Sequence, residues 1–186
     1  MSDLLRSSAL WYLVRGSGIV ALILLTIVVA LGVATTTRWQ APGLPRFVTA
    51  AVHRSVALLA VTFLSIDVLT SIVDSYVSIS VVDVFVPFIG SVKPVALGLG
   101  AVAFDLVVAL VLTSLLRAKL GFKAWRAVHW LAYLAWPVAL LHGLTMGRDA
   151  GASWNLIVVA SCVLTVGAAL AWRLQAAKTA AVQGVA

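Results

Sequence analysis

The sequence has few charged residues and little of the chemistry that soluble enzymes use. Only 10% of its 186 residues are charged, glutamate is absent, and 63% of the residues are hydrophobic. A soluble domain carries about 25% charged residues, so this composition excludes an ordinary soluble fold. It also excludes a disordered chain, which needs low hydrophobicity and high charge. We therefore expect an integral membrane protein.

The chain contains one cysteine, Cys162, within an apolar run. A single cysteine excludes an internal disulfide, a CxxC motif and a cysteine-ligated cluster, and we interpret it as a small packing residue. The formal net charge of +7 comes from basic residues at the ends of apolar segments. This distribution is typical of orientation signals rather than of a nucleic-acid-binding patch, so we expect no nucleic acid as a partner.

Five apolar stretches are long enough to cross a bilayer. They comprise about residues 11–34, 47–73, 94–116, 124–146 and 152–172. Each must be helical, because lipid offers no hydrogen-bonding partner to the backbone. We predict a single all-α transmembrane domain over residues 1–186, built as a five-helix bundle in the lipid bilayer of the cytoplasmic membrane. The length leaves no room for a soluble catalytic domain.

Basic residues are unequally divided between the two ends of these helices. The richer side holds nine of the thirteen, namely Arg38, Arg46, Arg54, Arg117, Lys119, Lys123, Arg126, Arg173 and Lys178. Because the side richer in Lys and Arg is normally cytoplasmic, we expect the N-terminus outside and the tail at 173–186 in the cytoplasm. The long loop at 74–93 would then be extracytoplasmic, either lying on the membrane surface or covering a site as a lid.

Five ionisable residues fall inside the predicted spans, where charge is costly and a functional role is expected by default. His53 and Asp67 lie in the second span, Asp105 in the third, and His129 and His142 in the fourth. All three histidines of the chain are among them. Asp105 has no obvious partner in the sequence, and we assign it no role.

His53 and His129 would lie at similar depths, a turn or two inside the cytoplasmic face. Two imidazoles facing each other across a bundle can supply both axial ligands of a haem iron. Zinc would need a third protein ligand, which the sequence does not offer at that depth. His53 and His129 are therefore candidate ligands of a haem iron. Arg54 and Arg126 lie beside them and are either contacts for the haem propionates or ordinary positive-inside residues.

A second level is predicted near the outer face. His142 follows His129 by thirteen residues, a rise of roughly 20 Å, and Asp67 follows His53 by fourteen. His142 could bind a second haem alone or with another partner, hydrogen-bond Asp67, or contribute to a quinone or proton site. An ideal helix would turn His142 about 140° away from His129, and Pro137 between them can distort the helix.

The two histidine-bearing spans resemble those of the ferric reductase-like transmembrane family. That family includes ferric reductases, NADPH oxidases and the bacterial haem subunit of the periplasmic methionine sulfoxide reductase system. The fourth span reads WRAVHWLAYLAWPVALLHGL, in which Trp125, His129, Tyr133 and His142 match the family's paired-histidine helix. The second span reads HRSVALLAVTFLSID, in which His53 and Arg54 match the other ligand helix. The resemblance extends over about residues 11–172.

The resemblance implies a haem b subunit that passes electrons across the membrane. The donor would be a cytoplasmic flavoprotein or quinol, and the acceptor an extracytoplasmic protein, ferric complex or flavin. Asp67 stands where the family often has a second histidine, so one haem is expected and two remain open. Because the chain ends soon after its last span, FAD and NAD(P)H are expected only on a separate partner.

Two other interpretations remain open. A small quinol-oxidising cytochrome b would bind haem but need no flavoprotein. A haem-free transporter or assembly factor would use the intramembrane His and Asp residues to relay protons or bind a substrate. The absorption spectrum of the purified protein distinguishes the haem-binding interpretations from the haem-free one.

Overall fold

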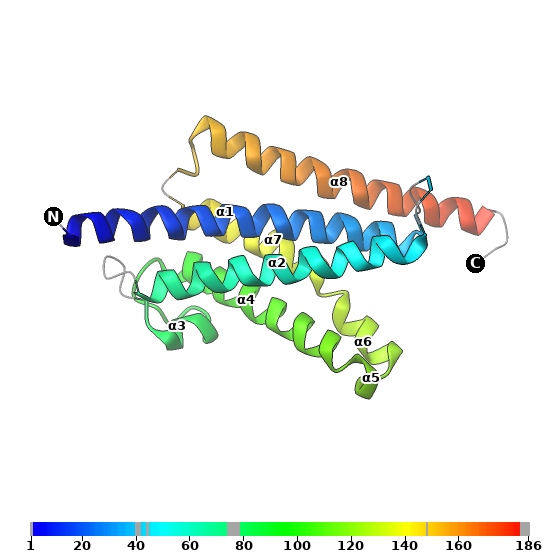
Figure 1. Cartoon of the computed structure of the whole chain (residues 1–186), viewed down its shortest axis with the longest axis horizontal. Coiled ribbons are helices and arrows are strands. Elements are labelled where there is room, and N and C mark those ends of the chain that lie inside the picture. Colours follow the sequence, from blue (N-terminus) through cyan, green and yellow to red (C-terminus); the bar gives the residue numbers. More distant parts are fainter. Residues whose placement is uncertain (1, 40–41, 44, 74–78, 148, 183–186) are drawn as a thin grey trace.

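The computed structural model describes residues 2–39, 42–43, 45–73, 79–147 and 149–182, without the side chains of residues 2–11 and 46. Over these ranges the regular structure is entirely helical. The long helices are α1 (Ser2–Thr36), α2 (Arg46–Val73), α4 (Pro94–Leu115), α7 (Ala132–Met146) and α8 (Ser153–Val182), and the short ones are α3 (Val81–Phe85), α5 (Arg117–Leu120) and α6 (Phe122–His129). Figure 1 shows the long helices with their axes roughly aligned along the length of the molecule.

Five helical segments of the described chain are long and apolar enough to cross a membrane. They are Tyr12–Thr36, Phe47–Val73, Pro94–Leu115, Phe122–Met146 and Ser153–Val182. The predicted all-α fold with five spans is therefore confirmed. The orientation stays a prediction, and Arg148, which counts toward it, lies outside the described residues.

The last helix is longer than the sequence pattern indicates. We expected the span to end near Trp172, whereas α8 continues to Val182. The added segment is rich in alanine, which has the highest intrinsic helix propensity, so the helix continues after the apolar run ends. Most of the predicted tail at 173–186 is thus helical, and residues 183–186 lie outside the described part.

Helix α1 occupies the centre of the bundle. It packs along α2 and also contacts α7 and α8, whereas α4 packs against α7, α3 and α6. The core between α1, α7 and α8 contains Val29, Trp136, Cys162 and Val166. The Trp136 indole N–H donates a hydrogen bond of 2.9 Å to the Thr26 hydroxyl, which joins α7 to α1 inside this core. Cys162 is a buried packing residue, as expected.

The fourth span is broken between α6 and α7. The backbone N–H groups of Leu131, Tyr133 and Leu134 each bond a carbonyl three residues earlier rather than four. A 3₁₀ turn rotates by about 120° per residue, whereas an α-helix rotates by about 100°. The side chains of α6 and α7 therefore point in different relative directions than they would along one continuous α-helix. The expected distortion therefore lies one to two turns before Pro137, which itself sits inside α7. Pro137 lacks an N–H and crowds the carbonyl of Tyr133, at the end of this tightened turn.

The described part of the outer loop packs against the flank of α4. A capping box begins α3: the Ser80 hydroxyl accepts from the Val82 N–H, and the Asp83 carboxylate accepts from the Ser80 N–H. The rings of Phe85 and Phe104 meet edge to face, with centroids 5.6 Å apart. These contacts fix residues 79–93 against α4. The lid interpretation stays a prediction, and residues 74–78 lie outside the described part.

The bond between Trp136 and Thr26 predicts a stability difference. Thr26→Val keeps the shape of the side chain but leaves the buried indole N–H without an acceptor, so the free energy of unfolding should fall by about 1–2 kcal/mol. Thr62→Val is the control, because the Thr62 hydroxyl is exposed and bonds only the Leu58 carbonyl of its own helix. Unfolding of both variants in detergent measures the difference. Equal stability would show that the interhelical bond contributes nothing.

Candidate functional site

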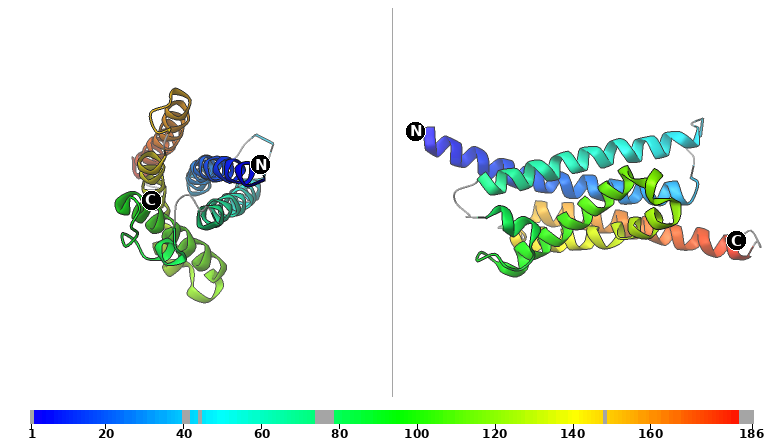
Figure 2. Two further views of the ribbon diagram at one scale, coloured as in Figure 1. Left: turned by 90° about the vertical axis from the view of Figure 1, so that its left-hand side faces the viewer. Right: turned by 90° about the horizontal axis from the view of Figure 1, so that it is seen from below.

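Two histidines from different parts of the bundle face each other. His53 comes from α2 and His129 is the last residue of α6. Their ring centroids are 6.4 Å apart, and their planes meet at 68°. Figure 2 shows α1 and α2 as a neighbouring pair beside the group that contains α4. Because α2 packs mainly on α1 while α6 packs on α4 and α5, the histidine pair lies where these two groups meet.

The His53 ring is held by α1. Its Nδ1 lies 3.1 Å from the carbonyl oxygen of Val28. A carbonyl can only accept, so Nδ1 carries the proton and Nε2 keeps a free lone pair. A Cβ at Gly32 would lie 3.5 Å from His53 Cε1, in ordinary contact. Helix α1 thus fixes both the tautomer and the position of this imidazole.

The His129 ring is held differently. Its Nδ1 is buried and has no hydrogen-bond partner in the described chain. The indole of Trp125, one helical turn earlier, stacks on the imidazole with centroids 4.8 Å apart and planes at 27°. The guanidinium of Arg117, from α5, lies 4.3 Å from the Trp125 ring centroid. His129 is therefore positioned by ring contacts and not by a hydrogen bond.

The arginines proposed from the sequence lie next to the pair in the chain but do not contact it. The side chains of Arg54 and Arg126 are exposed, and the Arg126 guanidinium lies 5.9 Å from the Phe122 ring. The arginine that reaches the surroundings of His129 is Arg117. From the sequence, Arg117 contributes only to the predicted orientation in the membrane, because its contact with Trp125 depends on the turn between α5 and α6.

Asp67 of α2 and His142 of α7 are the two residues of the predicted outer level. Each is held by a neighbouring helix: the Ser17 hydroxyl donates to Asp67 Oδ1 at 3.1 Å, and His142 Nδ1 donates to the Ala96 carbonyl at 2.7 Å. No hydrogen bond joins these two residues in the structure, so that predicted possibility is not observed.

Three of these polar side chains lie against glycines of a neighbouring helix. On α1, Gly18 faces Asp67 and Gly32 faces His53; on α4, Gly100 faces His142. The two glycines of α1 are fourteen residues apart, as are His53 and Asp67 on the antiparallel helix α2. Small residues let helices approach closely, and here they make room for polar side chains. The signal for this pairing in the sequence is the equal spacing of the two glycines and of the two polar residues opposite them.

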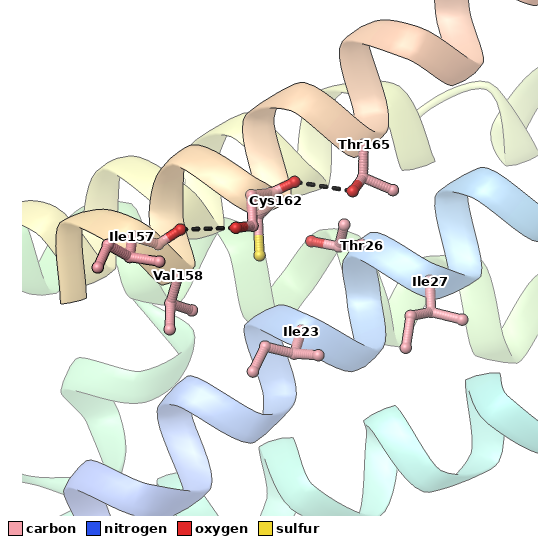
Figure 3. Close-up of a pocket in the computed structure, with 8 residues that line it drawn as sticks. Ile23, Thr26, Ile27, Ile157, Val158, Cys162 and Thr165 are labelled. Carbon is pink, nitrogen blue, oxygen red and sulfur yellow. Dashed lines mark hydrogen bonds between the residues drawn. The ribbon is translucent and has the colours of Figure 1, made fainter. Parts of the chain in front are cut away.

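Asp105 remains apart from both levels. It lies in α4 and is half-buried, and it makes no hydrogen bond with any residue that the structure describes. A hollow between α1 and α8 is also separate from the histidines. Figure 3 shows that it is lined mainly by apolar side chains, and the hydroxyl of Thr165 is occupied by a bond within α8. Neither feature joins the inner or the outer level.

The fold and these paired groups define a multi-pass, all-α membrane protein with ionisable residues facing each other inside the bundle. The family model described as ferric reductase like transmembrane component matches residues 17–140. This segment covers most of the chain and contains His53, Asp67 and His129, while His142 follows it by two residues. The chain therefore belongs to the ferric reductase-like transmembrane family and is a membrane redox component. Comparison with curated proteins and with solved structures gives no match.

The glycine opposite His142 predicts a specific steric effect. In Gly100→Ala the new Cβ would lie 2.6 Å from His142 Cε1, so the imidazole must move and the free energy of unfolding should fall by about 1–3 kcal/mol. Gly143→Ala is the control, since nothing lies within 4 Å of a Cβ at that position of α7. There the better helix propensity of alanine should leave stability unchanged or raised. Thermal unfolding in detergent measures both, and equal effects would contradict the close approach.

Proposed function

We propose that this protein is a haem b-binding subunit that carries electrons across the membrane, with His53 and His129 as the axial ligands. The observation that carries the proposal is the 6.4 Å separation of the two ring centroids. An imidazole nitrogen lies roughly 2 Å from a bound metal ion, and the ring centre about 1 Å further, so two opposed ligands place their centres roughly 6 Å apart.

The donor set also fits haem b. Among the described residues, no group of three His, Cys, Asp or Glu side chains could hold a metal ion, so the pair offers two imidazoles alone. Haem needs only two axial ligands from the protein, whereas a structural zinc site needs four. Buried His129 Nδ1 has no hydrogen-bond partner among the described residues, and the hydrogen bond of His53 to the Val28 carbonyl uses only its Nδ1.

In this function the residues of the chain hold and insulate the cofactor. Haem, when bound, supplies reversible one-electron chemistry at iron. The Val28 carbonyl orients His53, because a hydrogen bond at the second ring nitrogen fixes a ligating imidazole. Arg54 and Arg126 lie one residue after His53 and three before His129, at the end of the bundle where propionates would reach water.

We further propose that electrons enter at the inner level and leave toward the outside. The distribution of basic residues supports a cytoplasmic position for the ends of the helices near His53 and His129. A cytoplasmic flavoprotein carrying FAD and NAD(P)H, or a membrane quinol, would then be the donor. The acceptor would be an extracytoplasmic protein, ferric complex or flavin, and the membrane the cytoplasmic one.

The outer level supports a second, different site. Its two ionisable side chains are the imidazole of His142 from α7 and the carboxylate of Asp67 from α2. A carboxylate is an unusual axial ligand for haem b, whereas an imidazole and a carboxylate together can bind a quinone or exchange protons. We therefore propose Asp67 and His142 as a quinone or proton site, with a second haem on His142 as the alternative outcome.

The ligand assignment predicts loss of haem. Each of His53→Ala and His129→Ala removes one of two axial ligands, and the ratio of Soret absorbance to protein should fall at least about tenfold when haem is supplied during expression. The absorption spectrum of the purified variants measures this ratio. Full haem content in either variant would contradict the assignment, and a wild-type protein without a Soret band would contradict haem binding altogether.

The outer site predicts a contrasting result. His142→Ala should retain the haem content of the wild type, because His142 is not a ligand of the inner haem, while electron transfer to or from quinol slows. Pyridine haemochrome analysis measures haem per polypeptide. Loss of half of the haem would assign His142 to a second haem and overturn the quinone or proton role.

A further inference from the structure

The two histidines of the inner pair differ in what fixes their rings. His53 donates through Nδ1 to the Val28 carbonyl, whereas His129 has no hydrogen bond to any described residue. A ligating imidazole ordinarily donates its second N–H to a carbonyl, carboxylate or water, which sets the ring plane. For His129 that role must be filled by another contact.

Trp125 provides that contact. Its indole lies 4.8 Å from the imidazole centroid at an interplanar angle of 27°, so it is the stacked neighbour of His129. Its own position is fixed twice: the indole N–H donates to the Ser114 hydroxyl at 3.3 Å, and the Arg117 guanidinium lies 4.3 Å from the ring centroid. Trp125 is thus tied to α4 and α5 and can resist rotation of the imidazole.

Arg117 also brings a positive charge to this side of the pair. Its guanidinium lies 4.3 Å from the centroid of the Trp125 ring that stacks on His129, and 5.5 Å from that of the Phe122 ring. Two aromatic rings therefore hold the cation in place. A fixed positive charge favours the reduced form of a nearby redox centre, because reduction removes one unit of positive charge.

We propose that Trp125 and Arg117 are positioning residues that set the plane of the His129 imidazole and raise the reduction potential of the inner haem. This inference rests on the proposed haem function. The Trp125 ring restrains the imidazole in place of the missing hydrogen bond. The positive charge of Arg117, next to this ring, favours the reduced form of the haem. The two axial ligands are then tuned separately, one by a carbonyl of α1 and the other by an aromatic and cationic stack.

The chain contains a matched pair that separates this role from ordinary packing. The Arg173 guanidinium lies 4.3 Å from the Trp130 ring centroid, the same distance as between Arg117 and Trp125. Trp130 follows His129 directly in the sequence, but its ring neighbour is Tyr133. Substitutions of Trp130 and Arg173 therefore remove an equivalent arginine–tryptophan contact without removing a ring stacked on the histidine.

The experiment compares Trp125→Leu, Trp125→Phe, Arg117→Gln and Arg117→Lys with the controls Trp130→Leu and Arg173→Gln. Haem content, the low-spin ferric electron paramagnetic resonance spectrum and the midpoint potential are measured on each purified protein. Arg117→Gln should lower the ratio of reduced to oxidised haem at a fixed potential about three- to tenfold, where tenfold corresponds to 59 mV for one electron. Arg117→Lys should restore most of this ratio.

Trp125→Leu should shift or broaden the resonance spectrum through the altered plane of the imidazole, and Trp125→Phe should restore it in part. The controls should match the wild type in both measurements. Haem-containing Arg117→Gln and Trp125→Leu proteins that match the wild type, or controls that shift as far as these variants, would overturn this inference and leave the proposed function standing. A wild-type protein that binds no haem would overturn the proposed function and this inference with it.

Discussion

A polar side chain inside a lipid-embedded bundle must find a partner, and α1 supplies that partner to two of the helices it contacts, α2 and α7. The Val28 carbonyl accepts from His53 of α2, and the Thr26 hydroxyl accepts from Trp136 of α7. Farther out, the Ser17 hydroxyl donates to Asp67 of α2. Lipid offers no alternative hydrogen bond, so these contacts fix how α2 and α7 are rotated about α1. The inner and outer levels both depend on that rotation.

The same constraint explains why the inner pair suits a cofactor. His53 donates a hydrogen bond to α1 through one ring nitrogen, and His129 has no hydrogen-bond partner in the described chain. The pair therefore has ring nitrogens without a partner, which costs free energy inside an apolar bundle. The outer pair is different, because Asp67 and His142 each have a hydrogen bond to a neighbouring helix. One chain thus holds an unsatisfied pair suited to a metal centre and a partly satisfied pair suited to exchanging protons.

Much of this arrangement could be predicted from the sequence. The five spans follow from apolar length, and equal depth pairs His53 with His129, whose ring centroids lie 6.4 Å apart. The 3₁₀ turn before Pro137 could not be located, because a proline indicates distortion but not which turn tightens. Arg117 was missed for another reason: its contact with Trp125 joins two short helices across a turn, and no periodic pattern records such a contact. Helix α8 extends past the predicted span, because apolar length indicates where the chain crosses the membrane and not where the helix ends.

The central claim is that two histidines of one chain bind the same haem iron. The most direct test is the near-infrared magnetic circular dichroism and electron paramagnetic resonance of the purified wild-type protein in its oxidised form. Ligation by His53 and His129 predicts a low-spin ferric haem with two imidazole ligands. A high-spin spectrum, or a low-spin one whose second ligand is not histidine, would contradict the account.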